Sequence, residues 1–103
     1  MKASERPALC PRVEAAFGLL AKKWMGLILY SLNDGELYFS DLEKAIPALS
    51  ARVLTERIRE LELEGLVRRK ISDSSPVRVS YVLTENGKSL AGAVQGIADW
   101  ANS

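Results

Sequence analysis

The side chains in this chain that could do chemistry are cations and hydroxyl groups, and their neighbours do not suit catalysis. The sequence has no His, a single Cys and seven scattered Gly among its 103 residues. A Cys-His or Ser-His pair therefore cannot form, no Gly-rich phosphate loop is present, and a zinc ion would find only one thiol and carboxylates as ligands. We expect no enzyme activity, no catalytic residue, no bound metal and no cofactor.

The densest group of side chains suited to nucleic acid lies between residues 50 and 59. Arginine can bind guanine through two hydrogen bonds, and hydroxyl groups suit several base edges. At 100° per residue, Leu54, Ile58 and Leu61 fall on one face of a helix, and the polar groups fall opposite or beside them. The DNA contacts predicted here are Ser50, Arg52, Thr55, Glu56, Arg57 and Arg59. An ordinary solvated helix face is an equally good interpretation of these residues alone.

Two helices joined by a tight turn would position these side chains. Ser40 and Glu43 have the spacing of a capping box, which predicts the start of a short helix. Pro47 should end that helix, and Ser50 can cap a longer one that contains no Gly or Pro. Helices joined this closely cross steeply, so residues 40–64 predict a helix-turn-helix. The N-terminal half of the second helix carries its basic residues, and this half approaches base edges in such proteins.

A β-hairpin is predicted directly after the second helix, over residues 66–84. Gly65 can end the helix in the left-handed conformation. Two strands with a polar tip follow, and residues 77–84 alternate apolar and polar side chains as a half-buried strand does. The basic run at residues 68–70 suits phosphate, but Lys and Arg also protect exposed edge strands. Residues 36–38 could add a third strand. The predicted phosphate contacts of the hairpin are Ser74, Ser75 and Arg78.

Together these elements resemble the HxlR family of bacterial and archaeal transcription regulators, which are relatives of the MarR type. The residues that carry the resemblance are Cys10-Pro11, Lys23-Trp24, Leu27-Ile28-Leu29, Phe39, Leu42, Ile46-Pro47, Ser50, Leu54-Thr55, Arg59-Glu60-Leu61-Glu62, Gly65-Leu66-Val67, Tyr81, Leu83-Thr84, Gly87 and Trp100. The resemblance covers nearly the whole chain, with no large insertion. It implies an α+β, mostly helical fold: a winged helix-turn-helix with a two- to three-stranded wing sheet and dimerisation helices at both ends.

The function implied by the resemblance is sequence-specific binding of double-stranded DNA by a homodimer, with repression of a promoter as the expected outcome. Tyr38 stands where the family usually carries a basic residue, and Ala48 stands where it usually carries Gly. We therefore expect Tyr38, with Ser40 near it, to contact the DNA backbone more weakly than a cation would. These departures concern the operator sequence rather than the general function.

The two ends of the chain supply the apolar surface expected at the dimer interface. A helix over residues 85–101 has a long apolar stripe, and a domain of this size has little core left to cover it. A two-fold axis would place two reading helices about 34–36 Å apart on a pseudo-palindromic operator. The alternative is that these residues complete the core of a monomer. The predicted interface residues are Val13, Phe17, Leu90, Val94, Ile97 and Trp100.

The one thiol, Cys10, lies just before a helix that Pro11 can begin, where unpaired amides and the helix dipole favour a thiolate. Some members of the HxlR family use a Cys at the equivalent position to sense oxidants or electrophiles, so the resemblance implies a redox role. A buried structural thiol is the alternative. With one Cys per chain, a protein disulfide could form only between two subunits; otherwise oxidation must give a mixed disulfide or a sulfenic acid.

The composition sets the remaining expectations. Fourteen basic and thirteen acidic residues give a net charge of +1, which by itself would not indicate DNA binding. We expect one domain over residues 1–103, with a flexible arm over residues 1–9. The longest apolar run, Trp24 to Tyr30, has seven residues and is far too short for a membrane span. No export signal is visible, so we expect a cytoplasmic protein without a membrane partner.

Two further functions fit the same sequence. A winged helix can serve as a protein-interaction module, since fold alone does not determine function. Such a module should expose apolar groups around Arg52, whereas this sequence places cations and hydroxyls there. The regulator could also respond to a small molecule bound in the dimer crevice near Phe17 and Trp24, but the sequence does not specify this ligand.

Overall fold

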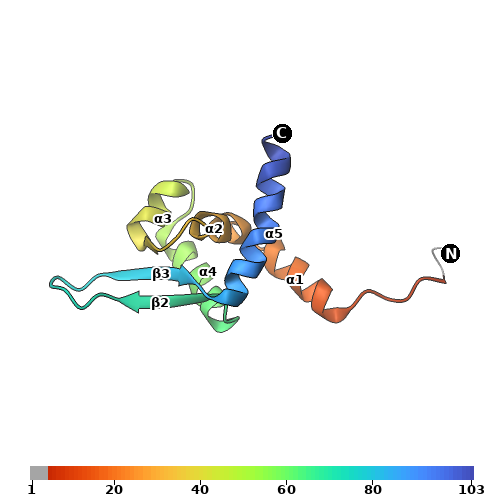
Figure 1. Ribbon diagram of the computed structural model, residues 1–103, viewed down its shortest axis with the longest axis horizontal. Helices are drawn as coiled ribbons and strands as arrows, with labels where there is room; N and C mark the ends of the chain where they lie inside the picture. Colours follow the sequence, from red (N-terminus) through yellow and green to blue (C-terminus); the bar gives the residue numbers. More distant parts are fainter. Residues whose placement is uncertain (1–4) are drawn as a thin grey trace.

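The computed structural model describes residues 5–103, which form five helices and a three-stranded sheet (Figure 1). The elements in chain order are α1 (Pro11–Ala21), α2 (Met25–Leu32), β1 (Leu37–Tyr38), α3 (Phe39–Ala45), α4 (Ala51–Leu63), β2 (Val67–Ile71), β3 (Val79–Leu83) and α5 (Glu85–Ala101). This arrangement is the predicted winged helix-turn-helix. Residues 1–4 of the arm predicted over residues 1–9 lie outside the described residues.

The core forms around α2, because this short helix is mostly apolar and the other elements pack against it. Met25, Ile28 and Leu29 of α2 are fully buried. Leu42 of α3 and Leu54 of α4 are buried just as completely, so the apolar sides of the helix-turn-helix face this core. Burying each of these side chains contributes about 1.5–3 kcal/mol. The opposite side of α4 is left to solvent.

The start of α3 differs from the prediction. The carboxylate of Asp41 accepts a hydrogen bond of 2.8 Å from the backbone N–H of Tyr38, and Tyr38 occupies the N-cap position. The predicted capping box of Ser40 and Glu43 is therefore wrong, and the helix begins two residues earlier. The reason lies in the sheet: Tyr38 is the last residue of β1, paired with Ser80, so the chain turns directly from strand into helix.

The end of α4 has the hydrogen bonds of a Schellman motif, as predicted. Gly65 has a φ of +73°, which favours Gly. The N–H of Leu66 donates to the carbonyl of Leu61 at 2.9 Å, and that of Gly65 donates to the carbonyl of Glu62 at 3.0 Å. The chain thereby leaves α4 and enters β2 almost at once.

The sheet has the order β1-β3-β2, with both pairs antiparallel. The central strand β3 begins at Val79, because residue 77 lies beyond the paired segment and is exposed; the predicted start at Val77 is two residues too early. Leu83 and Val67 face the core as a directly opposed pair. Ser80 is also buried, although the alternation placed it on the polar side, because Tyr38 and Lys70 flank it on the neighbouring strands.

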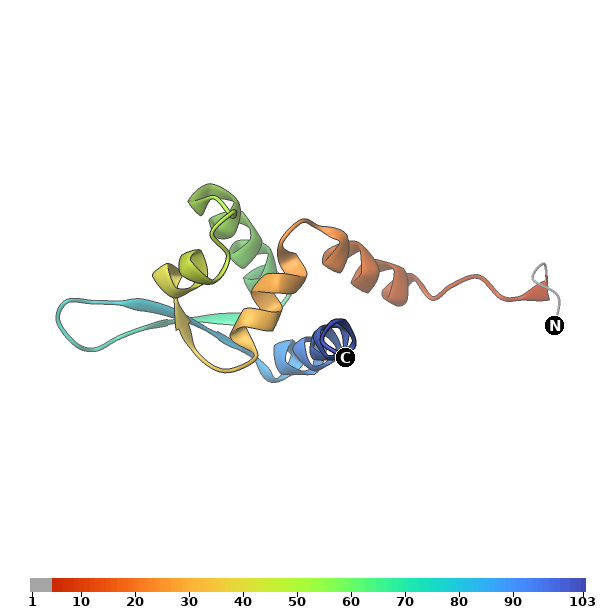
Figure 2. The same cartoon turned by 90° about the horizontal axis from the view of Figure 1, so that it is seen from above.

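The helix α1 extends beyond the body of the protein (Figures 1 and 2), and so does the end of α5 (Figure 1). No residue of α1 is buried, and Phe17 is 70% exposed. On α5, Ile97 is 61% and Trp100 is 78% exposed. Val94 differs from the prediction: it is only 7% exposed and belongs to the core of the single chain, so it offers little surface to a partner. The cause is α2, against which α5 packs.

A helix that spans a bilayer must be both long and predominantly apolar. Within residues 5–103, no single helix is both long and apolar enough to cross a membrane. The pair α1 and α2 meets both requirements only together, and the chain bends by 89° between them.

A close approach between α5 and the start of the wing yields a testable prediction. Replacing Gly87 with Ala should lower the midpoint of thermal unfolding, because the added Cβ would overlap the backbone carbonyl oxygen of Leu66. Such overpacking costs about 1–3 kcal/mol. Gly92 of the same helix has open space around it, so Gly92→Ala should gain about 1 kcal/mol from helix propensity. Circular dichroism compares the two variants, and equal midpoints would contradict the close packing.

Candidate nucleic-acid interface

The exposed face of α4 carries most of the predicted DNA contacts. Ser50 caps the helix, its Oγ accepting from the N–H of Val53 at 3.2 Å, so its side chain is engaged in the fold. The side chain of Arg52 is 88% exposed. Only a weak contact of 3.5 Å joins its Nε to Glu56, which leaves its guanidinium free to turn toward a partner. Arg59 and Thr55 are exposed on the same helix, where the hydroxyl of Thr55 donates to a carbonyl one turn earlier.

Arg57 does not lie on this face, although the sequence predicted it as a DNA contact. Its Nε donates to the backbone carbonyl of Lys23 at 2.9 Å, and its Nη1 lies 3.0 Å from Glu60. Only 19% of its side chain is exposed. Arg57 falls beside the apolar stripe of α4, so the helix turns it toward the α1–α2 turn rather than toward solvent. The sequence carries no signal for a contact between residues 34 positions apart.

The second part of the candidate interface joins β1 to the wing. The guanidinium carbon of Arg78 lies 3.5 Å from the centre of the Tyr38 ring, which is a close cation–π stack. The loop at the tip of the wing is closed by two hydrogen bonds of 2.9 Å between Ser72 and Arg78, just beyond the paired residues Ile71 and Val79. Arg78 is thus fixed in both backbone and side chain. Ser74 and Ser75 occupy the exposed tip, and Ser40 is exposed on α3.

Within the basic run of residues 68–70, Lys70 has an acidic partner on the same side of the sheet. These residues lie on β2, which is an edge strand. Lys70 forms an ion pair of 2.8 Å with Glu36. This contact, with a smaller contribution from the Ser80 hydroxyl, holds the pKa of Glu36 below its usual value. The pairing favours protection of the edge over binding of phosphate for Lys70.

Cys10 lies at the N-cap of α1 and is exposed, so it is not the buried structural thiol of the alternative interpretation. The backbone amide of Val13 lowers the pKa of the Cys10 thiol, and the amide and side chain of Arg12 add to the effect. A thiolate is the reactive form of cysteine. The residue is therefore placed where oxidants and electrophiles can reach it.

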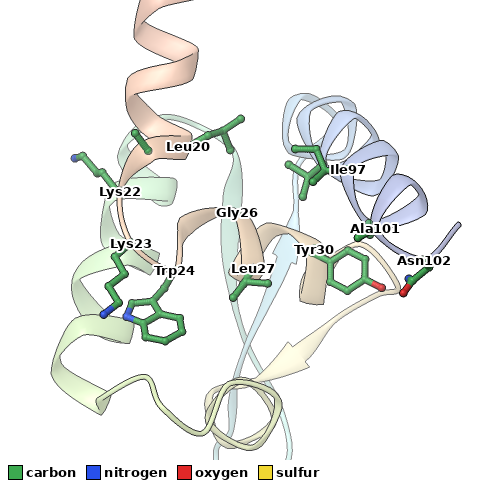
Figure 3. A pocket seen from close by; sticks show the side chains of 13 residues that line it. Leu20, Lys22, Lys23, Trp24, Gly26, Leu27, Tyr30, Ile97, Ala101 and Asn102 are labelled. Carbon is green, nitrogen blue, oxygen red and sulfur yellow. The ribbon is translucent and has the colours of Figure 1, made fainter.

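An apolar groove of about 600 Å³ lies between the α1–α2 turn and α5 (Figure 3). Trp24 and Leu27 line one side, and Ile97 lines the other. The ammonium group of Lys23 lies 5.0 Å from the centre of the Trp24 ring. Phe17 does not line the groove, so only part of the predicted ligand crevice is present in one chain. A small-molecule ligand here stays a prediction. No group of three or more metal-ligating residues exists within residues 5–103.

A helix-turn-helix, a wing and exposed terminal helices occur together in this chain. Known proteins have the same combination. The family model described as HxlR-like helix-turn-helix matches residues 19–103. The chain belongs to this family. It is 48% identical over 93 residues to YvaP of Bacillus subtilis, described as an uncharacterized HTH-type transcriptional regulator. That match covers 90% of this chain and 86% of YvaP.

Two solved structures of similar regulators share the fold. The reduced form of the transcriptional regulator YodB from B. subtilis is 41% identical, with a TM-score of 0.82, and the match covers 92% of this chain and 93% of YodB. The redox regulator HypR in its reduced form is 33% identical, with a TM-score of 0.80, covering 88% of this chain and 90% of HypR. This HxlR-like chain is accordingly a helix-turn-helix transcription regulator, and regulation of this kind is a non-enzymatic role.

Proposed function

We propose that this HxlR-like protein is a cytoplasmic homodimer that binds a specific double-stranded DNA operator and represses a promoter by occupying it. The observation that carries the proposal is the placement of Arg52, Thr55 and Arg59 on the exposed face of α4, next to a wing that holds Arg78. The rival function, a protein-interaction module, would favour an apolar surface there. Cations and hydroxyls suit base edges and phosphates instead.

In this proposal the two parts of the interface have different tasks. The N-terminal half of α4 enters the major groove, where Arg52 and Arg59 can bind base edges. The wing follows the DNA backbone, and Arg78 binds a phosphate. Because Tyr38 holds the guanidinium of Arg78 in place, less side-chain entropy is lost when the phosphate binds. The overall charge of +1 does not oppose this, because the local field depends on where charges lie, and Arg52, Arg59 and Arg78 are all exposed.

The proposed dimer rests on apolar surface that one chain leaves uncovered. Phe17 on α1 and both Ile97 and Trp100 on α5 are more than half exposed, and Val13 is 45% exposed. A group of large exposed apolar side chains indicates a contact surface. Leu90 is partly buried against the core and can contribute only its exposed edge. A second copy with the same patch would cover it across a two-fold axis.

We also propose that Cys10 makes the regulator responsive to oxidants or electrophiles. The exposed thiol and its lowered pKa support this. Relatives point the same way: solved structures of YodB include diamide-treated and quinone-bound forms, and HypR is described as a redox regulator. Oxidation by diamide would remove one hydrogen from each of two thiols and join two Cys10 residues as a disulfide.

Substitution of two arginines tests DNA binding. On an operator selected from a random pool, Arg52→Ala should cost about 1–3 kcal/mol and relax the preference at one base pair. Arg78→Ala should weaken binding to all DNA sequences equally and reduce the slope of log affinity against log salt by about one. Lys88→Ala removes a cation from α5 and should leave the affinity, the base preference and the salt slope unchanged. Fluorescence anisotropy measures all three, and wild-type behaviour of both arginine variants would refute the assigned surface.

Trp100→Asp tests the dimer. Because Trp100 is exposed, the substitution should leave the fold intact. It should raise the dissociation constant of the dimer, and the free energy of dimerisation should become less favourable by at least about 2 kcal/mol if the ring is central to the interface. Light scattering coupled to gel filtration gives the mass. Leu63→Asp is the matched control, since Leu63 is equally exposed but lies at the end of α4. A monomeric wild type, or a monomer only for Leu63→Asp, would contradict the proposed interface.

Diamide treatment tests the thiol. The wild-type protein should change its operator affinity and migrate as a disulfide-linked dimer, and dithiothreitol should reverse both effects. Cys10→Ser should respond to neither reagent. An equal change of affinity in the two proteins would exclude Cys10 as the responsive group.

A further inference from the structure

Three side chains connect the α1–α2 turn to α4. The ammonium Nζ of Lys22 lies 2.8 Å from Oε2 of Glu60, and Nη1 of Arg57 lies 3.0 Å from its Oε1. Both carboxylate oxygens of Glu60 are thus bound. Arg57 also donates from Nε to the carbonyl of Lys23 at 2.9 Å, so α4 is tied to the backbone of the turn as well as to its side chain. We call Lys22, Arg57 and Glu60 the turn clamp.

The turn that the clamp holds has a strained backbone. Trp24 has a φ of +77° and is the only residue other than Gly with a positive φ within residues 5–103. An aromatic residue is disfavoured in this region and keeps such a conformation only where its surroundings enforce it. The Trp24 ring lies in the groove beside Leu27, with Lys22 and Lys23 on the same turn (Figure 3). The clamp and this packing together determine the turn.

The turn determines in which direction α1 points. α1 buries no residue and packs mainly on α2, with the 89° bend between them. Besides the turn, the only α1 side chains that pack against the core within residues 5–103 are Leu19 and Leu20, which are partly buried and adjoin the turn. The angle between α1 and α4 therefore depends mainly on the residues at and next to positions 22–24. The proposed dimer pairs α1 and α5, whereas the proposed reading surface lies on α4. The clamp therefore lies in the part of the chain that connects the proposed dimer interface to the proposed DNA-binding surface.

We propose that the turn clamp sets the angle between α1 and α4 and thereby determines which spacing of DNA half-sites the dimer accepts. This inference rests on the proposed function. When two linked modules bind together, affinity rises far above that of one module, and the gain is lost if the geometry forbids both contacts. Arg57, Glu60 and Lys22 are thus positioning residues that act on DNA binding without touching the DNA.

Glu60→Gln is the test variant, because it removes the charge that both cations bind but keeps the size of the side chain. Glu85→Gln is the matched control, since it removes an exposed pair with Lys88 on α5. Affinities are measured by anisotropy on the selected operator, on a single half-site, and on operators with the half-site spacing changed by one or two base pairs. Purified full-length dimers are used throughout.

The expected result separates positioning from simple loss of stability. Glu60→Gln should bind the single half-site as the wild type does, lose roughly tenfold or more on the full operator, and discriminate less between spacings. Glu85→Gln should keep the wild-type profile. Equal losses on half-site and full operator, or an unchanged spacing profile, would overturn the proposal.

A measurement without DNA keeps the proposal testable even if the proposed function fails. Spin labels at Cys10 and at an introduced Thr55→Cys report the distance between α1 and α4, and excess unlabelled protein suppresses distances between chains. The distance distribution should broaden when Glu60→Gln is added and should stay narrow with Glu85→Gln. An unchanged distribution with Glu60→Gln would overturn the clamp whatever the outcome with DNA.

Discussion

The structure depends most on the contact between the end of α4 and the start of α5. The hydroxyl of Thr84 donates to the carbonyl of Gly65 at 2.7 Å and accepts from the N–H of Gly87 at 3.0 Å, and the Thr84 N–H donates to Leu66 at 3.0 Å. The side chain of Thr84 thus binds the residue that follows α4 and caps the start of α5. The wing leaves and returns at this point, and the absent side chain of Gly87 allows the two backbones to meet. The relative positions of α4, wing and α5 follow from it.

The fold gives different roles to cations that the composition cannot distinguish. With 14 basic and 13 acidic residues, no net charge favours DNA. Burial of one side of α4 decides which cations face outward: Arg52 and Arg59 do, whereas Arg57 is bound to the α1–α2 turn. On the sheet, Lys70 is neutralised by Glu36, and Arg78 is stacked on Tyr38. The position of each cation, rather than the number of cations, therefore decides which of them are exposed and which are held by close partners within the chain.

The terminal helices show how a small domain can connect stability to assembly. Ala91 and Val94 of α5 are buried in the core, whereas Ile97 and Trp100 of the same helix stay exposed. The helix α1 projects without any buried residue. A chain of this size has little further apolar material with which to cover them. A partner that covers this surface would also orient α1. Because the strained turn at Trp24 connects α1 to the body and Arg57 of α4 is hydrogen-bonded to this turn, a change in the orientation of α1 can affect α4.

The elements with local causes could be predicted from the amino-acid sequence. Ser50 caps α4, Gly65 ends it in a Schellman motif, Pro11 begins α1 and alternation indicates β3, because each depends on residues a few positions apart. The capping box at Ser40 failed because pairing of Tyr38 with Ser80 decided where α3 begins. Only the tertiary structure decided the roles of Arg57, Val94 and the Tyr38–Arg78 stack. Their partners lie on other elements, and helical periodicity cannot state which neighbour a given face will meet.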